Sequence, residues 1–208
     1  MHRIRHDGVM KLSEIAVPDT RAARGALDIA TEYHTPSLLN HVQRSWLWAE
    51  AFSRLRGLDA DRELLYVAAL LHDVGLVPEF DNATLAYEDA GGHVAVALTA
   101  GAGWPGERRV RVHEVIVRHN WPEVDPALDV EGHLLEIATA LDISGARPNE
   151  LPAPFLREVL DRYPRLDLAS EFAACVTDQA SRKPDTAARR LVDGGVARKL
   201  RENPLEQA

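Results

Sequence analysis

The chain has 208 residues, of which 46% are hydrophobic, and a formal net charge of -8 at pH 7. This length can bury one substantial core, and because an ordinary domain has roughly 100 to 200 residues, we expect one domain over residues 1–208. The acidic balance argues against nucleic acid or an anionic membrane as the main partner, since both select basic proteins.

Cysteine usage and apolar run length together indicate a cytoplasmic protein. The one cysteine, Cys175, cannot form an internal disulfide and is typical of a reducing compartment. No apolar stretch approaches the roughly 20 residues of a membrane span, and MHRIRHDGVMKL lacks the apolar core of a signal peptide. We therefore expect a small-molecule substrate and neither nucleic acid nor membrane as partner. A homo-oligomer is compatible with the sequence.

The first clearly marked helix is predicted within residues 34–57. Thr35 is a good N-cap, Pro36 takes the first helical position and Gly57 follows the last turn. One stripe at helical spacing carries Leu38, His41, Ser45, Trp48, Phe52 and Leu55. His41 is therefore predicted to lie on the helix face that packs against the core.

A second helix is predicted in DADRELLYVAALLHDVG, residues 59–75. It begins at Asp59 or Asp61 and is apolar almost all round over residues 67–71, which indicates burial on most sides. The apolar run ends on His72 and Asp73.

This histidine and aspartate doublet needs a partner, because an unpaired buried charge costs several kcal/mol or more. A metal ion is the candidate partner. Adjacent side chains in a helix point about 100° apart, so His72 and Asp73 can share one ion only where the helix ends. Gly75 is predicted to stop the helix and to permit that turn.

The remaining segments predict further helices and no strand series, which gives an all-α fold without repeats or a domain boundary. A loop leads to a small-residue helix at about residues 91–100, followed by helices in ERRVRVHEVIVRHN and VEGHLLEIATALDISG. After the proline-rich ARPNELPAP we expect two or three more helices, through FLREVLDRY and EFAACVTDQASRK. The basic stretch at residues 182–201 is interpreted as a solvated helix face.

Four side chains from three helices form the candidate metal site: His41, His72, Asp73 and Asp142. Two imidazoles and two carboxylates suit one divalent ion, with zinc the first candidate and iron or manganese the alternatives. Asp73 and Asp142 each close a helix, where the helix dipole disfavours a carboxylate unless a cation is bound. Taken alone, His41 is compatible with a hydrogen-bonded core histidine, and Asp142 with a cap or half of an ion pair; the combination favours the metal site.

The order of these residues resembles the HD superfamily of metal-dependent, mainly phosphohydrolytic enzymes, with NHVQRSWLWAEAF, LLYVAALLHDVGL and LEIATALDISG in its register. Within it the chain most resembles the cyanamide hydratase-like group. The further likenesses are VPDT, TPSLLNH, YEDAGG, VIVRH, RYPR and KPDT, in the expected order over about residues 15–190. The resemblance implies a single helical bundle with the metal between its core helices, held by His41, His72, Asp73 and Asp142.

The resemblance also implies a catalytic set of Asp73, Glu88 and His119. Helical periodicity does not choose between His113 and His119, and the resemblance favours His119 as general base, as partner of a ligand or as ligand of a second metal. Glu88 is a candidate to orient water or substrate, although a loop glutamate is usually solvated. The sequence leaves the contribution of three residues undecided: Arg44, His93 and His113.

The expected function is a metal-dependent HD-domain enzyme that uses metal-activated water to hydrate or hydrolyse a small molecule. A phosphoester would need cations around its oxygens, and only Arg44 and Arg118 are basic in the site-forming segments. This scarcity favours a nitrile or C–N substrate, as in the cyanamide hydratase-like group. The alternatives are an HD-type phosphohydrolase for a nucleotide or other phosphoester, and a non-catalytic, metal-bound, ligand-sensing HD domain.

Overall fold

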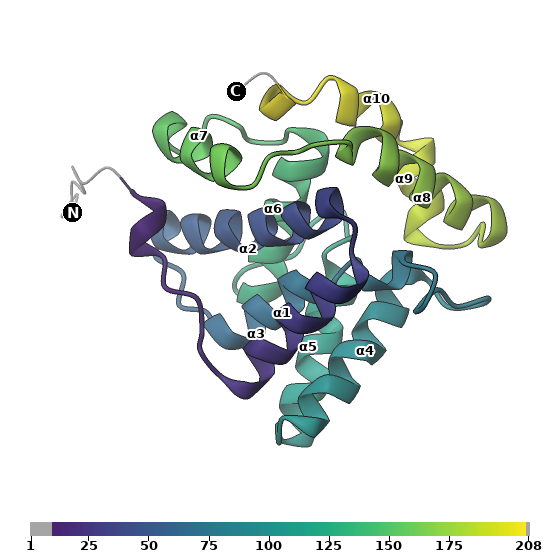
Figure 1. Cartoon of the computed structure of the whole chain (residues 1–208), viewed down its shortest axis with the longest axis horizontal. Helices are drawn as coiled ribbons and strands as arrows, with labels where there is room; N and C mark the ends of the chain where they lie inside the picture. The colour runs from purple at the N-terminus through teal and green to yellow at the C-terminus, as the bar shows by residue number, and fades with distance from the viewer. Residues whose placement is uncertain (1–9, 207–208) are drawn as a thin grey trace.

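The computed structural model describes residues 10–206, and within this range the chain forms α-helices and short 3-10 helices without a strand (Figure 1). In chain order these are η1 Leu12–Glu14, α1 Arg21–Tyr33, α2 Pro36–Arg56, α3 Arg62–Leu71, η2 Val74–Leu76, α4 Tyr87–Gly101, α5 Gly106–Arg118, α6 Val130–Ser144, α7 Ala153–Arg162, α8 Leu168–Arg182, α9 Ala187–Asp193, α10 Val196–Arg201 and η3 Pro204–Glu206. The all-α prediction is confirmed. A single domain stays a prediction. Among the described residues, no helix has both the length and the apolar character needed to cross a bilayer.

Helix α2 begins and ends where its capping residues predict. The side chain of Thr35 accepts a hydrogen bond from the backbone N–H of Leu38, and Gly57 takes the left-handed conformation with φ of 65°. The predicted core-facing stripe is buried up to Phe52, but Leu55 is 49% exposed. Inclusion of Leu55 in the stripe was wrong, because the last turn of α2 extends beyond the helices that cover it.

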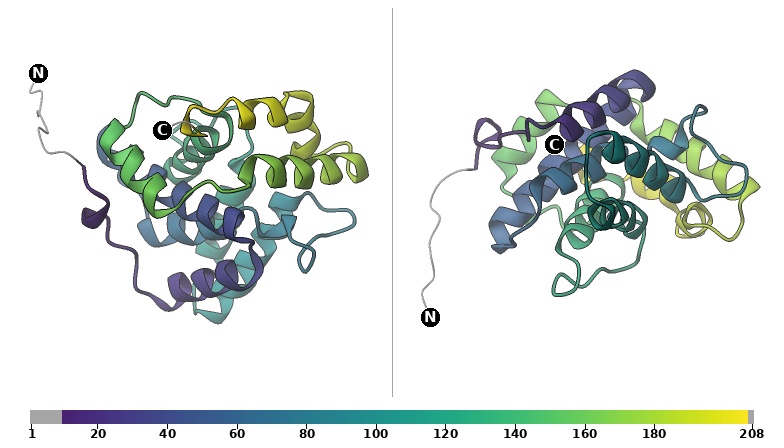
Figure 2. Two further views of the ribbon diagram at one scale, coloured as in Figure 1. Left: turned by 45° about the horizontal axis from the view of Figure 1, so that its top comes forward. Right: turned by 90° about the horizontal axis from the view of Figure 1, so that it is seen from below.

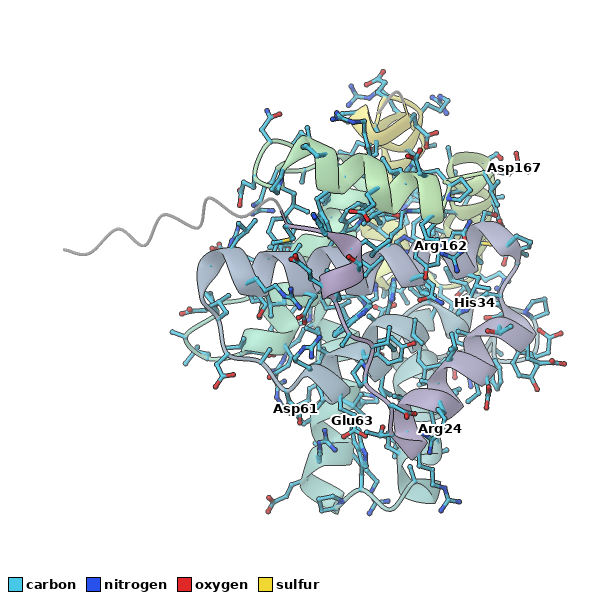
Figure 3. The ribbon with its side chains drawn as sticks, turned by 60° about the vertical axis from the view of Figure 1, so that its left-hand side comes forward. Arg24, His34, Asp61, Glu63, Arg162 and Asp167 are labelled. Carbon is cyan, nitrogen blue, oxygen red and sulfur yellow. The ribbon has the colours of Figure 1, made fainter. Side chains whose placement is uncertain are left out.

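Helix α3 is the buried centre of the fold, as its continuous apolar run predicts. Asp61, labelled in Figure 3, caps it by accepting from the backbone N–H of Leu64. Every residue of α3 from Leu64 to Leu71 is buried. The helix packs against α1, α2, α4, α5 and α6, so its C-terminal end points His72 and Asp73 into the interior.

Gly75 has a different role from the predicted helix stop. The helix ends at Leu71, and Gly75 lies inside η2 without a positive φ. A methyl group on Gly75 would overlap the carbonyl oxygen of Tyr87, and one on Gly91 would lie 2.8 Å from the carbonyl oxygen of Leu71. These two glycines therefore let the first turns of α4 lie directly against the end of α3.

Helix α4 begins at Tyr87, four residues before the predicted start at about residue 91. Glu88 and Asp89 made this segment look like a loop, but acidic residues in a first helical turn are favoured by the helix dipole. Glu88 is consequently a buried helical residue, 5% exposed, and the expectation of a loop glutamate was wrong.

The C-terminal part of the chain adds four helices, α7 to α10, where two or three were predicted. Figures 1 and 2 show α8, α9 and α10 together at one end of the molecule, and α10 also packs on α6. Their apolar residues form a second hydrophobic cluster with Leu38, Tyr87 and Ile143. This layer closes one side of the space above the end of α3.

We predict that Gly75→Ala lowers the free energy of unfolding by at least about 2 kcal/mol, because the added methyl group meets backbone that cannot move aside. Gly101→Ala is the matched control, since nothing lies within 4 Å of its Cβ position and its φ is not positive. The control should be neutral or more stable by up to about 1 kcal/mol. Urea unfolding measures both changes, and equal stabilities would contradict the close approach of η2 and α4.

Candidate metal centre

Three donor atoms converge at the end of α3: Nε2 of His41, Nε2 of His72 and Oδ2 of Asp73. Each pair of these atoms is 3.2 Å apart, and all three side chains are at most 1% exposed. Ligand atoms that bind one ion at about 2.0 to 2.2 Å lie roughly 2.8 to 3.6 Å from one another, from octahedral to tetrahedral geometry. The spacing therefore fits a single divalent ion.

When both rings are neutral, the hydrogen bonds of the two histidines leave this convergence point without a proton. His72 Nδ1 donates to the carbonyl oxygen of Ala69 at 2.7 Å, and His41 Nδ1 donates to Asp142 Oδ2 at 2.7 Å. In the neutral rings both Nε2 atoms are then acceptors, and neither oxygen of the buried Asp73 has a hydrogen-bond partner among the described residues. Three acceptors that face one another in a dry interior need a cation between them.

The pKa values of the cluster show the same attraction for positive charge. Burial favours the neutral form of Asp73, but the electrostatic attraction of His72 and His41 outweighs it and holds the pKa of this carboxyl well below its usual range. For His41, burial opposes protonation, yet Asp142 and Asp73 together raise its pKa. An ion would replace these protons, as metal ligands must be deprotonated.

Asp142 lies on the other side of the His41 ring, away from the convergence point. Its Oδ2 accepts from His41 Nδ1 and from Arg44 Nη2, both at 2.7 Å. Its Oδ1 accepts from Arg44 Nε at 2.8 Å and from Trp48 Nε1 at 2.9 Å. The three-residue cluster consists of His41, His72 and Asp73, so direct binding of the ion by Asp142 stays a prediction.

The geometry gives Asp142 the role of orienting His41. Burial favours the neutral carboxyl, but the Arg44 guanidinium, itself fully buried, holds the pKa of Asp142 well below its usual range. A charged Asp142 fixes the Nδ1–H tautomer of His41 and directs Nε2 toward His72, as carboxylates behind metal-bound histidines commonly do. Arg44 therefore holds the site together through this ion pair.

His119, at the C-cap of α5, lies next to the cluster. Its Nδ1 donates to the carbonyl oxygen of Ile116, its Nε2 is 3.9 Å from Asp73 Oδ1, and its ring centroid is 4.7 Å from that of His72. Burial, with the charge of His72, lowers the pKa of His119 to about 3, so the ring is neutral at physiological pH. The structure thus separates His119 from His113, which instead lies against His93 on the outer side of α4 and α5, at a centroid distance of 4.9 Å.

Glu88 is close to the site without lining its cavity. It occupies the first turn of α4 beside Tyr87, and its Oε2 has no hydrogen-bond partner among the described residues. Burial raises the pKa of Glu88 to about 7, with Asp89 and Asp73 adding to the rise. A catalytic role for Glu88 stays a prediction, and any contact with substrate would need a rearrangement of this turn.

A cavity of about 190 Å³ opens from the cluster. Its wall comprises His41, His72, Asp73, Tyr87, His119, Asn120, Trp121, Glu136, Thr139, Ala140, Ile143, Ser144, Phe172, Arg190, Leu191, Val196 and Lys199. Glu136 is a polar member that the sequence reasoning missed. The available signal was an acidic residue on the otherwise apolar face of α6 that also carries Thr139 and Ile143.

The cavity wall contains basic residues that the sequence did not lead us to expect near the site. Arg118 pairs with Asp129 and Glu114 rather than lining the cavity. Arg190 and Lys199 do line it, and both are also exposed, as expected for the solvated helix face predicted in this stretch. No local pattern distinguishes them from their neighbours; only the packing of α9 and α10 brings them to the site.

We predict that Glu88→Gln changes how stability depends on pH. The pKa of Glu88 is raised from 4.5 to about 7, so its favourable contribution is complete below about pH 4.5 and is lost as the pH rises through 7. Relative to wild type, Glu88→Gln should gain about 3 kcal/mol between pH 4.5 and pH 9. Denaturant unfolding at several pH values measures the gain, with the exposed Glu79→Gln as control. A flat difference for Glu88→Gln would contradict the raised pKa.

Comparison with known proteins agrees with this geometry. The family model described as HD domain matches residues 38–144, the segment that contains the cluster and Asp142. Two Saccharomyces cerevisiae proteins, cyanamide hydratase DDI2 and cyanamide hydratase DDI3, are each 31% identical to the chain over 171 residues, covering 80% of this chain and 76% of theirs. The chain therefore belongs to the HD-domain family and is a metal-dependent hydrolase or hydro-lyase similar to the cyanamide hydratases.

Proposed function

We propose that this enzyme adds water to a nitrile-like or other C–N group of a small molecule, using a divalent ion held by His41, His72 and Asp73. The convergence of three buried acceptor atoms on the floor of a cavity carries the proposal. The names of the yeast relatives support the C–N substrate. Zinc is the proposed ion, with iron or manganese as alternatives.

A divalent ion bound here lowers the pKa of water toward neutrality and polarises the atom under attack. The protein residues supply position and proton handling. Asp142 and Arg44 fix the direction of His41, and the peptide carbonyl of Ala69 does the same for His72. His119 keeps a free Nε2 lone pair near Asp73. This nitrogen accepts a hydrogen bond from the attacking water and passes the proton of that water toward the substrate nitrogen.

Hydrolysis of a phosphoester is the second candidate, and one observation favours it. Arg190 and Lys199 line the cavity, and phosphoryl transfer needs cations around the developing negative charge.

The other expectations from the sequence stay predictions. They are one domain, a cytoplasmic location, and a small-molecule partner without nucleic acid or membrane. A homo-oligomer stays compatible with the sequence.

We predict that the purified enzyme, reconstituted separately with zinc, iron or manganese, releases urea from cyanamide or the amide from small nitriles. Asp73→Asn should abolish this turnover, because it removes the charged carboxylate from the group of residues that would hold the metal. Colorimetric assays of urea and of phosphate from nucleoside monophosphates decide the class. Phosphate release without any nitrile or cyanamide turnover would replace the proposal with the phosphohydrolase. Tight metal binding without turnover of either class would favour a ligand sensor.

We predict that the paired variant His72→Ala, Asp73→Ala loses the bound metal, whereas His119→Gln keeps most of it and loses activity by a factor on the order of 100. Elemental analysis of the purified variants measures the metal. Asp142→Asn tests the two candidate roles of Asp142. Loss of the metal identifies Asp142 as a ligand. Retention of the metal with an affinity lowered by about 10- to 100-fold identifies it as the residue that orients His41. A full metal equivalent in the paired variant would refute the assigned cluster.

A further inference from the structure

The C-terminal helices α9 and α10 supply one wall of the cavity above the cluster. Arg190 and Leu191 come from α9, and Val196 and Lys199 come from α10. The two helices are anchored by the second hydrophobic cluster, which includes their buried Ala188, Val196 and Leu200. The backbone that carries the two basic side chains is therefore fixed by packing, as a binding wall requires.

Arg190 and Lys199 have no acidic partner in the part of the chain that the structure describes, unlike Arg189 and Arg198 on the same two helices. Among the described residues, neither has a carboxylate within salt-bridge distance, whereas Arg189 pairs with Asp193 and Arg198 with Glu202. This is notable in a chain with a formal net charge of -8, where acidic partners are abundant. Two unpaired cations on the wall of an active-site cavity are thus available to a ligand.

The charge of Arg190 acts inside the cavity. Burial raises the pKa values of both Tyr87, on the cavity wall, and Glu88 behind it, and Arg190 counteracts both increases. A ligand anion in the cavity would experience the same attraction, which solvent screens in part because Arg190 and Lys199 are exposed.

The cavity has room for a substrate larger than cyanamide. A volume of 190 Å³ is far above the roughly 10 to 15 Å³ that one water molecule needs on a comparable measure. A molecule with three heavy atoms would leave most of this space to water. A larger substrate can instead extend from His72 and Asp73 to the opposite wall at Arg190 and Lys199.

We propose that Arg190 and Lys199 form an oxyanion-binding subsite, which holds a carboxylate or phosphate group of the substrate while the reacting group lies at His41, His72 and Asp73. The substrate is accordingly an anionic small molecule. This inference rests on the proposed function only in taking the cavity as the catalytic one. Charge-assisted hydrogen bonds from a guanidinium and an ammonium group supply the recognition.

Anion binding to the metal-loaded enzyme tests the subsite without requiring turnover. Isothermal titration calorimetry with inorganic phosphate and with succinate, at constant ionic strength, compares wild type with two double variants. Arg190→Gln, Lys199→Gln should raise the dissociation constant by at least about tenfold, since hydrogen bonds to charged groups contribute that much or more. Arg189→Gln, Arg198→Gln is the matched control from the same helices, with its residues outside the cavity, and should bind like wild type.

The outcomes are distinct. Selective weakening with phosphate, with succinate or with both supports the subsite and identifies which oxyanion it accepts, and Arg190→Lys should retain binding within a few-fold. Equal binding in all three proteins would assign the anion to the metal ion and overturn the proposal, as would absence of binding to wild type. Metal content is measured in parallel: its absence from wild type would count against the proposed function, while the anion titration still reports on the subsite.

Discussion

The structure depends on three acceptor atoms that meet in a dry interior and attract positive charge. Because Nδ1 of His41 and Nδ1 of His72 are both occupied as donors, their Nε2 lone pairs and the carboxylate of Asp73 repel one another until a cation is present. Several features of the fold serve this arrangement. Helix α3 is buried from Leu64 to its end at Leu71, and two glycines allow α4 to lie against that end.

A second set of interactions holds the arrangement from behind and joins distant parts of the chain. The guanidinium of Arg44 pairs with Asp142 and also donates to the carbonyl oxygens of Tyr163 and Pro164. Arg165 and Asn203 donate to the backbone carbonyl oxygen of Asp142 at 2.7 and 2.9 Å. The fully buried ion pair is thus well supplied with hydrogen bonds, the condition under which burying charges is tolerated.

Local signals in the sequence predicted most of the helices, though not α1, and also marked the three residues of the cluster. Thr35 and Asp61 cap helices in the expected ways, and the break of an apolar run at His72 and Asp73 by itself indicates a cation. What the sequence could not give is the outcome of packing. Gly75 permits a close approach of two segments, which no local pattern encodes, and the side of the His41 ring on which Asp142 lies depends on Arg44 and Trp48 together.

The contact between Asn203 and Asp142 has a consequence for how the site is completed during synthesis. The two residues are 61 positions apart, and the family match ends at residue 144, so every residue of the motif is made well before its last support. At roughly 5 to 20 residues per second, the ribosome needs about 3 to 12 s to cover that interval. During this time the carbonyl oxygen of Asp142 lacks the partners that Arg165 and Asn203 later provide. A nascent chain carrying the whole motif is therefore not yet a finished metal centre.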